Sequence, residues 1–114
     1  KIFFYINTIS SGGAERVLTN LATEMSVRGH KCTIVTSFPC SWEYSYGKGV
    51  RRISLNSNKI EVYLKRNVLL TCRLRKLLVL EKPDILVSFM AEPNFRATIA
   101  KSELVLNLFF HCVV

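Results

Sequence analysis

Several familiar functional signatures are absent from this sequence. Its four cysteines form no Cys-x-x-Cys pair, so zinc and thiol-redox motifs lack support, and we expect no metal site. The longest apolar run, residues 104–110, falls far short of the roughly 20 residues that a membrane-spanning helix needs. Because no small-residue cleavage site follows the apolar N-terminal run, we expect no signal peptide and a cytoplasmic location.

Acidic residues are also scarce, and the excess of basic residues is unevenly distributed. The 114 residues carry 16 Lys and Arg against 8 Asp and Glu, which gives a net charge of +8. Residues 51–82 alone hold nine Lys or Arg against two Glu. Such a segment attracts anionic lipid head groups, phosphorylated ligands or nucleic acid. No nucleic-acid-binding motif accompanies the charge, so we expect no nucleic-acid partner.

The two best-known glycine patterns for nucleotide binding are missing as well. The segment 11–16 (SGGAER) reads neither as Gly-x-Gly-x-x-Gly nor as a P-loop. It does lie between residues 1–7, an apolar run typical of a buried parallel strand, and a helical pattern that begins about Gly13. Paired glycines allow a sharp turn and a close approach of a ligand, and the N–H groups at a helix start favour phosphate. From the loop alone, an anion-binding loop and a tight turn without a ligand both remain open.

Hydrophobic spacing along the chain predicts an α/β domain. The expected strands are residues 1–7, 31–37, 50–55, 85–90 and 104–110, and the expected helices run from Gly13 or Ala14 to about 28, from 59 to 80 and from 92 to 101. This order predicts an open, Rossmann-like parallel sheet with helices on both faces and strand order 3-2-1-4-5. Ligands of such sheets bind beyond the carboxyl ends of the strands, between the first and fourth strands. Both Gly12-Gly13 and residues 89–94 fall there, which favours a ligand-binding loop.

The same spacing indicates which side chains form the core. Cys32 and Cys72 are interpreted as small buried apolar residues, and residues 38–48 as an exposed loop that carries aromatic side chains. The apolar face of the first helix is expected to hold Val17, Leu18, Leu21, Ala22 and Met25. That of the second is expected to hold Leu64, Val68, Leu70, Leu74, Leu77 and Leu78.

The second predicted helix combines this apolar side with a basic one. Packing on the sheet with a wet basic face is the default interpretation, and contact with an anionic membrane surface is an additional role for the same face. The residues assigned to this membrane or anion patch are Lys65, Arg66, Arg73, Arg75 and Lys76.

Two segments resemble the N-terminal, acceptor-side domain of family-4 glycosyltransferases of the GT-B fold. They are residues 11–36, with SGGAERVL followed by Leu21-Ala22, Gly29-His30 and the strand 32–36, and residues 82–89 (KPDILVSF). The resemblance implies that residues 1–114 form a partial N-terminal Rossmann-like domain. It also implies that the donor-binding C-terminal domain of that family, with its paired glutamates, is absent from this chain.

The resemblance implies a retaining transferase that moves a sugar from a UDP- or GDP-sugar to a surface-glycan or lipid-linked acceptor, as in capsule or lipopolysaccharide assembly. No cofactor is expected besides this nucleotide-sugar substrate. The chain alone is then expected to be inactive, as a truncated gene product or one subunit of a split enzyme. The alternative is a non-catalytic module that binds an anionic lipid or a partner through the basic helix.

The resemblance also suggests roles for individual residues. Gly12 and Gly13 are implied to donate backbone hydrogen bonds to the donor diphosphate or its sugar. His111 is a catalytic candidate, because some family members carry a histidine just after the fifth strand; a chain-end histidine without such a role is the alternative. Glu92 and Asn94 are placed at the rim of the predicted cleft as contacts for acceptor hydroxyls, although Glu92 also suits a helix start.

Overall fold

A computed structural model describes residues 1–55, 63–102 and 110–113 of the chain. The elements follow one another in the order predicted from the sequence. They are β1 (Ile2–Ile6), α1 (Gly13–Val27), β2 (Cys32–Thr36), β3 (Arg51–Ser54), α2 (Tyr63–Glu81), β4 (Ile85–Ser88), α3 (Ala91–Ser102) and β5 (Phe110–Val113). The predicted start of the second helix, at residue 59, lies outside the described residues.

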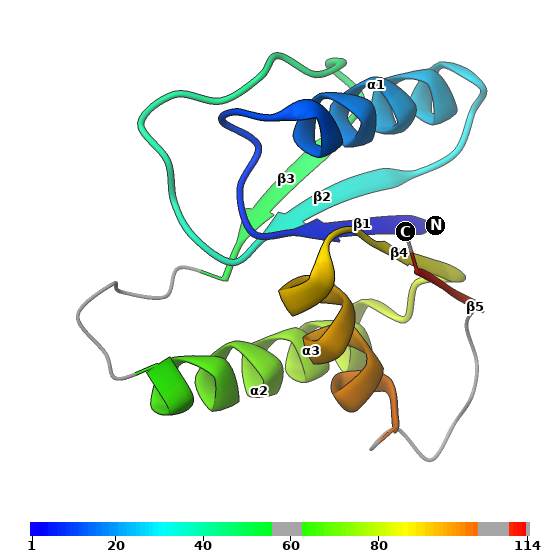
Figure 1. The fold of residues 1–114 in the computed structure, drawn as a ribbon. Coiled ribbons are helices and arrows are strands. Elements are labelled where there is room, and N and C mark those ends of the chain that lie inside the picture. The colour runs from blue at the N-terminus through cyan, green and yellow to red at the C-terminus, as the bar shows by residue number, and fades with distance from the viewer. Residues whose placement is uncertain (56–62, 103–109, 114) are drawn as a thin grey trace.

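The described strands form one parallel sheet with the order β3-β2-β1-β4-β5, which confirms the predicted topology (Figure 1). All five residues of β1 and of β2 are buried, as expected for apolar strands in the interior of a sheet covered on both faces. β3, whose Arg51 and Ser54 are exposed, lies at one edge. In the register, Tyr5 of β1 pairs with Val35 of β2 and with Ser88 of β4, so these strands end at the same edge.

Alternate residues of β1 point into two separate cores, one on each face of the sheet. Ile2, Phe4 and Ile6 pack with Leu18 and Ala22 of α1. Phe3 and Tyr5 pack on the opposite face, because successive side chains of a strand alternate. Their partners there come from α2 and α3: Leu70, Leu74, Leu78, Ala97 and Ala100. The prediction of helices on both faces is therefore confirmed, with α1 on one side and α2 and α3 on the other (Figure 1).

The predicted bounds of the fifth strand are wrong. The strand was expected to end at Phe110, but Phe110 is the first residue of β5, which continues to Val113. Pairing with β4 sets these bounds, since Phe110 lies opposite Ile85 and Val113 opposite Ser88. An apolar run carries no information about such a register, and most of the predicted segment, residues 103–109, lies outside the described residues.

Some side chains assigned to the core are exposed. Val17 and Leu21 of α1 are 56% and 39% exposed, because α1 meets the sheet along the narrower stripe of Leu18 and Ala22. On α2 the buried stripe consists of Leu70, Leu74 and Leu78. Val68 and Cys72 are therefore exposed, since a residue two positions from a buried one lies about 200° around the helix. The interpretation of Cys32 as a buried apolar residue is confirmed, whereas that of Cys72 is wrong.

Glu81, at the end of α2, connects this helix to β3 and to the first residue of the chain. Its Oε1 lies 2.9 Å from Arg51 Nη2, and its Oε2 lies 3.1 Å from Lys1 Nζ. The hydrogen bond from Arg51, followed by that from Lys1, holds the pKa of Glu81 below its ordinary value of 4.5. Because the folded pKa is the lower one, the stabilisation is present above the ordinary pKa and is lost as pH falls through the folded pKa.

We therefore expect Glu81→Gln to be less stable than the wild type at pH 7, and the difference to shrink at an acidic pH at which the Glu81 carboxylate becomes protonated. Urea unfolding at the two pH values measures this. A difference that stays the same at both would show that the charge of Glu81 does not stabilise the fold.

Candidate functional site

The carboxyl edge of the sheet brings together the segments that the sequence predicts to bind a ligand. The connection from β1 into α1, residues 7–13, is called the glycine loop and begins at this edge. The segment after β4 begins α3 beside it. The N–H of Phe89 donates to the carbonyl of Tyr5 over 3.0 Å, and Asn7 Nδ2 donates to Glu92 Oε2 over 3.3 Å. The segments that follow β1 and β4 thus meet at this edge, through Asn7 and Glu92.

Gly12 and Gly13 play different structural parts in the loop. Gly12 precedes α1 with φ +107°, a conformation that side chains disfavour, so the turn itself depends on this glycine. Gly13 is the first residue of α1, and a Cβ added to it would meet no atom within 4 Å. The space at the Cβ position of Gly13 is therefore open, and the turn does not require this glycine.

Glu15, in the first turn of α1, folds back over the loop, which the sequence analysis did not anticipate. Its Oε2 lies 2.5 Å from the position that a Cβ on Gly12 would take. A carboxylate is favourable there because the helix N-terminus carries a partial positive charge. An incoming anion must share this positive field with Glu15 or displace it.

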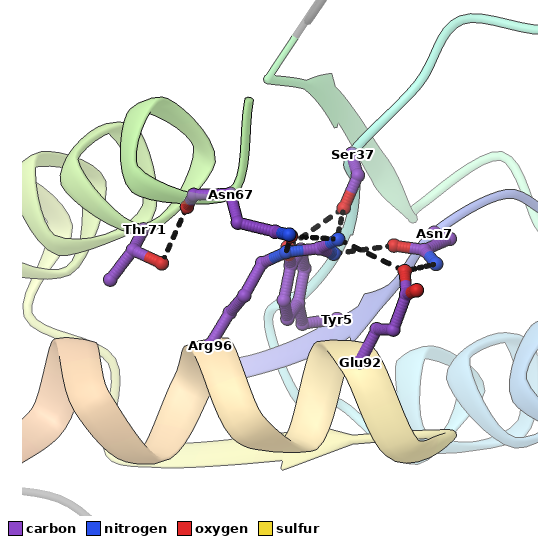
Figure 2. Close-up of polar contacts among 7 residues, drawn as sticks. All are labelled: Tyr5, Asn7, Ser37, Asn67, Thr71, Glu92 and Arg96. Atoms are coloured by element: carbon purple, nitrogen blue, oxygen red, sulfur yellow. Dashed lines mark hydrogen bonds and ion pairs between the residues drawn. The ribbon is translucent and has the colours of Figure 1, made fainter. Parts of the chain in front are cut away.

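A buried arginine organises the polar side chains at this edge (Figure 2). The side chain of Arg96, from α3, is 1% exposed. Its Nε and Nη2 donate to Asn67 Oδ1 of α2 over 3.0 and 2.8 Å, and its Nη1 donates to Asn7 Oδ1 over 2.7 Å. Its Nη2 also lies 3.1 Å from Glu92 Oε2. The guanidinium thus links α2, α3 and the end of β1.

Two hydroxyls complete this polar cluster. Arg96 Nη1 donates to Ser37 Oγ over 3.2 Å and to the Tyr5 hydroxyl over 3.4 Å. The hydroxyls of Tyr5 and Ser37 lie 2.7 Å apart. Burial raises the pKa of Tyr5, so this hydroxyl stays neutral and the cluster keeps its hydrogen bonds over a wide pH range.

Sequence patterns pointed to Glu92 but not to Arg96 or its other partners, although some signals were present. Asn7 and Ser37 follow directly after buried strands, at the edge already expected to bind ligands. Arg96 lies one turn after Glu92 and beside the buried Ala97, so it is a charged residue in an apolar stripe. Charged side chains are almost never fully buried unless they are paired, and this one is paired.

The structure places Glu92 and Asn94 in the first turn of α3. Glu92, with its side chain 44% exposed, receives hydrogen bonds from both Arg96 and Asn7. It therefore combines the helix-start position with a fixed carboxylate at the ligand edge. Asn94 is half-buried, and its N–H donates to the carbonyl of Met90 over 3.0 Å.

His111 lies within β5, opposite Leu86, and not after the strand as expected. The reason is the shifted position of the strand itself. A catalytic role for His111 remains a prediction, but the family position invoked for it, just after the fifth strand, is not where this residue lies.

The membrane or anion patch of five basic residues on α2 stays a prediction, and the structure shows what some of these side chains contact. The guanidinium of Arg66 lies 5.2 Å from the centre of the Phe38 ring, and Arg73 Nη1 donates to the carbonyl of Leu55 over 2.6 Å. Lys65 is exposed in the first part of the helix. Three of the five do border one shallow hollow of about 470 Å³, together with apolar side chains. It is lined by Leu69, Cys72, Arg73, Arg75, Lys76 and Val79.

A second hollow, of about 590 Å³, lies between α2 and α3. Its walls include Val68 and Phe95, which are 64% and 68% exposed, and its polar side includes Glu92 and Arg96. Its size falls within the range of small-molecule sites.

In the described parts of the chain, no helix is long and apolar enough to cross a membrane. Nor do three His, Cys, Asp or Glu side chains gather there as metal ligands would.

The parallel sheet with its switch point beside a glycine loop defines a Rossmann-like α/β domain. A comparison with known families identifies the family more closely: residues 11–112 match the model of Glycosyltransferase Family 4. The match covers most of the chain, so the chain belongs to Glycosyltransferase Family 4, and its fold is that of the N-terminal half of a GT-B enzyme. No curated protein matches the chain.

Proposed function

We propose that this domain is the acceptor-side half of a retaining glycosyltransferase that transfers a sugar from a UDP- or GDP-sugar to a surface-glycan or lipid-linked acceptor. The observation that carries this proposal is the open space above Gly13 at the N-terminus of α1, at the switch point of a family-4 domain. The leaving nucleoside diphosphate gains negative charge in the transition state. Backbone N–H groups oriented toward that charge lower the barrier to transfer.

In this proposal Glu92 binds the acceptor. Its Oε2 is held by Arg96 and Asn7, which fixes a half-exposed carboxylate at the same edge as the glycine loop. A fixed carboxylate accepts hydrogen bonds from sugar hydroxyls, and Asn94 in the same turn offers an amide for the same purpose. In the same proposal a second, donor-binding domain holds the donor nucleotide, so the chain alone does not catalyse sugar transfer.

The reading frame downstream of the codon for Val114 tests this proposal first. A following domain with paired glutamates eight residues apart supports a complete transferase, and that protein should transfer sugar from UDP- or GDP-sugars in a radiolabel assay. The frame could instead end at this codon, and the chain could fail to transfer sugar even with a separately supplied donor domain. These two results together would favour the alternative, a non-catalytic module that binds an anionic lipid or a partner.

Glu15 provides a test of anion binding at the loop. We expect Glu15→Gln to bind UDP or GDP a few-fold more tightly, because a competing carboxylate leaves the helix N-terminus. Isothermal titration calorimetry measures the affinity. Glu24→Gln is the matched control, since it removes the same charge from an exposed site near the other end of α1. Equal affinities in the two variants would argue against anion binding beside Gly12.

A second proposed role is attachment to the cytoplasmic face of an anionic membrane. Arg73, Arg75 and Lys76 border one hollow with the exposed Val79, and Leu80 beside them is 77% exposed. Cations interspersed with apolar side chains suit a bilayer surface that contains anionic lipid. This arrangement supports peripheral binding through three of the five residues first considered.

Replacing these three residues by Gln should weaken binding to vesicles with 30% phosphatidylglycerol by about two orders of magnitude at low salt. Binding of the wild type should also fall as salt rises. Co-sedimentation measures both effects. The matched control replaces Arg28, Lys31 and Lys48, exposed residues near α1 on the other side of the sheet, and so changes the net charge equally. If both triple variants bind equally, the hollow on α2 is not the membrane site.

A further inference from the structure

The long connection between β2 and β3 displays an exposed aromatic pair beside the glycine loop. Trp42, the single tryptophan of the sequence, is 59% exposed. The rings of Trp42 and Tyr44 lie edge to face, with centroids 5.1 Å apart and planes at 65°. The expectation of an exposed aromatic loop holds for Trp42, whereas Phe38, Tyr44 and Tyr46 are half-buried. An exposed indole offers a ligand both an apolar face and a polar N–H.

The residues next to Trp42 are firmly attached to the rest of the domain. Glu43 forms two hydrogen bonds with Arg52 of β3, of 2.6 and 3.2 Å, and both side chains are mostly buried. The N–H of Tyr44 donates to the carbonyl of Ile9 over 2.8 Å, which ties the aromatic segment directly to the glycine loop. The backbone that carries the indole is thus held in place, which lowers the ordering entropy that a ligand stacking on the ring must overcome.

A cation completes this surface. Arg16, in the first turn of α1, is exposed, and its guanidinium lies 5.9 Å from the centre of the Tyr44 ring. This distance is within the range of cation–π contacts, so Arg16 is held against the aromatic pair. The surface formed by Trp42, Tyr44 and Arg16, here called the aromatic shelf, therefore stands at the N-terminus of α1, beside Gly12 and Gly13.

We propose that the aromatic shelf binds a pyranose ring of the substrate. The C–H groups on one face of such a ring form an apolar surface that packs on the exposed indole, while the ring hydroxyls reach the indole N–H and the Arg16 guanidinium at its edge. This inference rests on the proposed function, since it assumes a sugar substrate. In this inference Trp42 recognises the sugar, and the glycine loop binds the diphosphate.

The single tryptophan allows a direct test. Methyl glycosides of glucose, galactose, mannose and N-acetylglucosamine, then UDP-glucose and GDP-mannose, then UDP and GDP, are titrated into the chain while indole emission and acrylamide quenching are followed. We expect a saturable emission change and protection from acrylamide with a sugar-containing probe. A response to glycosides assigns the ring to the acceptor; a response to nucleotide-sugars but to neither glycosides nor nucleotides assigns it to the donor.

Variants separate stacking on Trp42 from binding elsewhere. Saturation-transfer NMR with the responding probe should show affinity at least about tenfold weaker for Trp42→Ala and an intermediate loss for Trp42→Phe, which keeps an aromatic face but lacks the indole N–H. Val27→Ala is the control, because Val27 is an exposed apolar residue at the other end of α1, away from the shelf, and should have no effect. Both sites are exposed, so the variants should fold.

Three results would overturn the shelf: no emission change with any probe, unchanged affinity of Trp42→Ala, or an equal response to UDP or GDP without sugar. The last would indicate stacking of a base. The proposed function is judged separately, by the backbone resonances of Gly12 and Gly13 on addition of UDP or GDP. If these resonances shift although the aromatic shelf binds no sugar, the proposal for the glycine loop stands without the aromatic shelf.

Discussion

Replacing Arg96 by leucine should lower the free energy of unfolding by about 3 kcal/mol and the melting temperature by about 15 °C. The side chain is 1% exposed, and its loss leaves the acceptor atoms of Asn7 and Asn67 without the donor that satisfies them. The Tyr5 and Ser37 hydroxyls lose the same partner inside the core. Thermal and urea unfolding measure the effect.

Two comparison variants define what the Arg96 result means. Arg96→Lys keeps the charge but offers fewer donors in a different geometry, so we expect an intermediate loss. Arg28→Leu removes an exposed arginine that pairs with Glu24 four residues away, and should cost no more than about 0.5 kcal/mol. If Arg96→Leu were as mild as Arg28→Leu, the buried cluster would not hold α2, α3 and β1 together.

Replacing Gly13 by valine should reduce sugar transfer by a factor of about 10²–10³ in the transferase that contains this domain. The new side chain projects into the open space above the helix N-terminus and excludes the diphosphate from the N–H groups. Because a Cβ on Gly13 meets no atom within 4 Å, the stability of the domain should change by less than about 1 kcal/mol. Transfer rates and melting curves of the same preparation measure both quantities.

Gly12→Ala is the informative counterpart. Gly12 has φ +107°, and a Cβ there meets the Glu15 carboxylate, so this substitution should cost about 1–2 kcal/mol of stability. If Gly12→Ala loses both sugar transfer and stability, the substitution has disrupted the turn. If Gly13→Val loses sugar transfer but keeps its stability, the substitution has blocked the ligand. Normal transfer by Gly13→Val would remove the glycine loop from the mechanism.

The sequence sufficed to predict the fold order because the strands are short apolar runs separated by helical spacing. β1 and β2 illustrate this, since every residue in them is buried. The end of the sheet was harder to predict. β5 takes its bounds from its pairing with β4, and that register depends on backbone contacts between distant segments rather than on the apolar run before it.

The candidate site was predictable only where local patterns define it. Gly12-Gly13 and Glu92 stand next to strand ends and helix starts, which leave marks in the sequence. Arg96 does not, because its partners outside α3 lie 29 to 91 positions away and only folding brings them together. The basic helix shows a related limit. The count of basic residues predicts the net charge of the helix. The direction in which each side chain points depends instead on which stripe of α2 the sheet buries.

We propose that the start of α1 binds the diphosphate of a nucleotide-sugar. Two-dimensional ¹H–¹⁵N NMR of the chain, titrated with a UDP-sugar and a GDP-sugar, tests it most directly. We predict saturable shifts of the amide resonances of Gly12, Gly13 and Ala14 with at least one of them, and their loss in Gly13→Val. Unmoved resonances at these three amides with both nucleotide-sugars at millimolar concentration would contradict the claim.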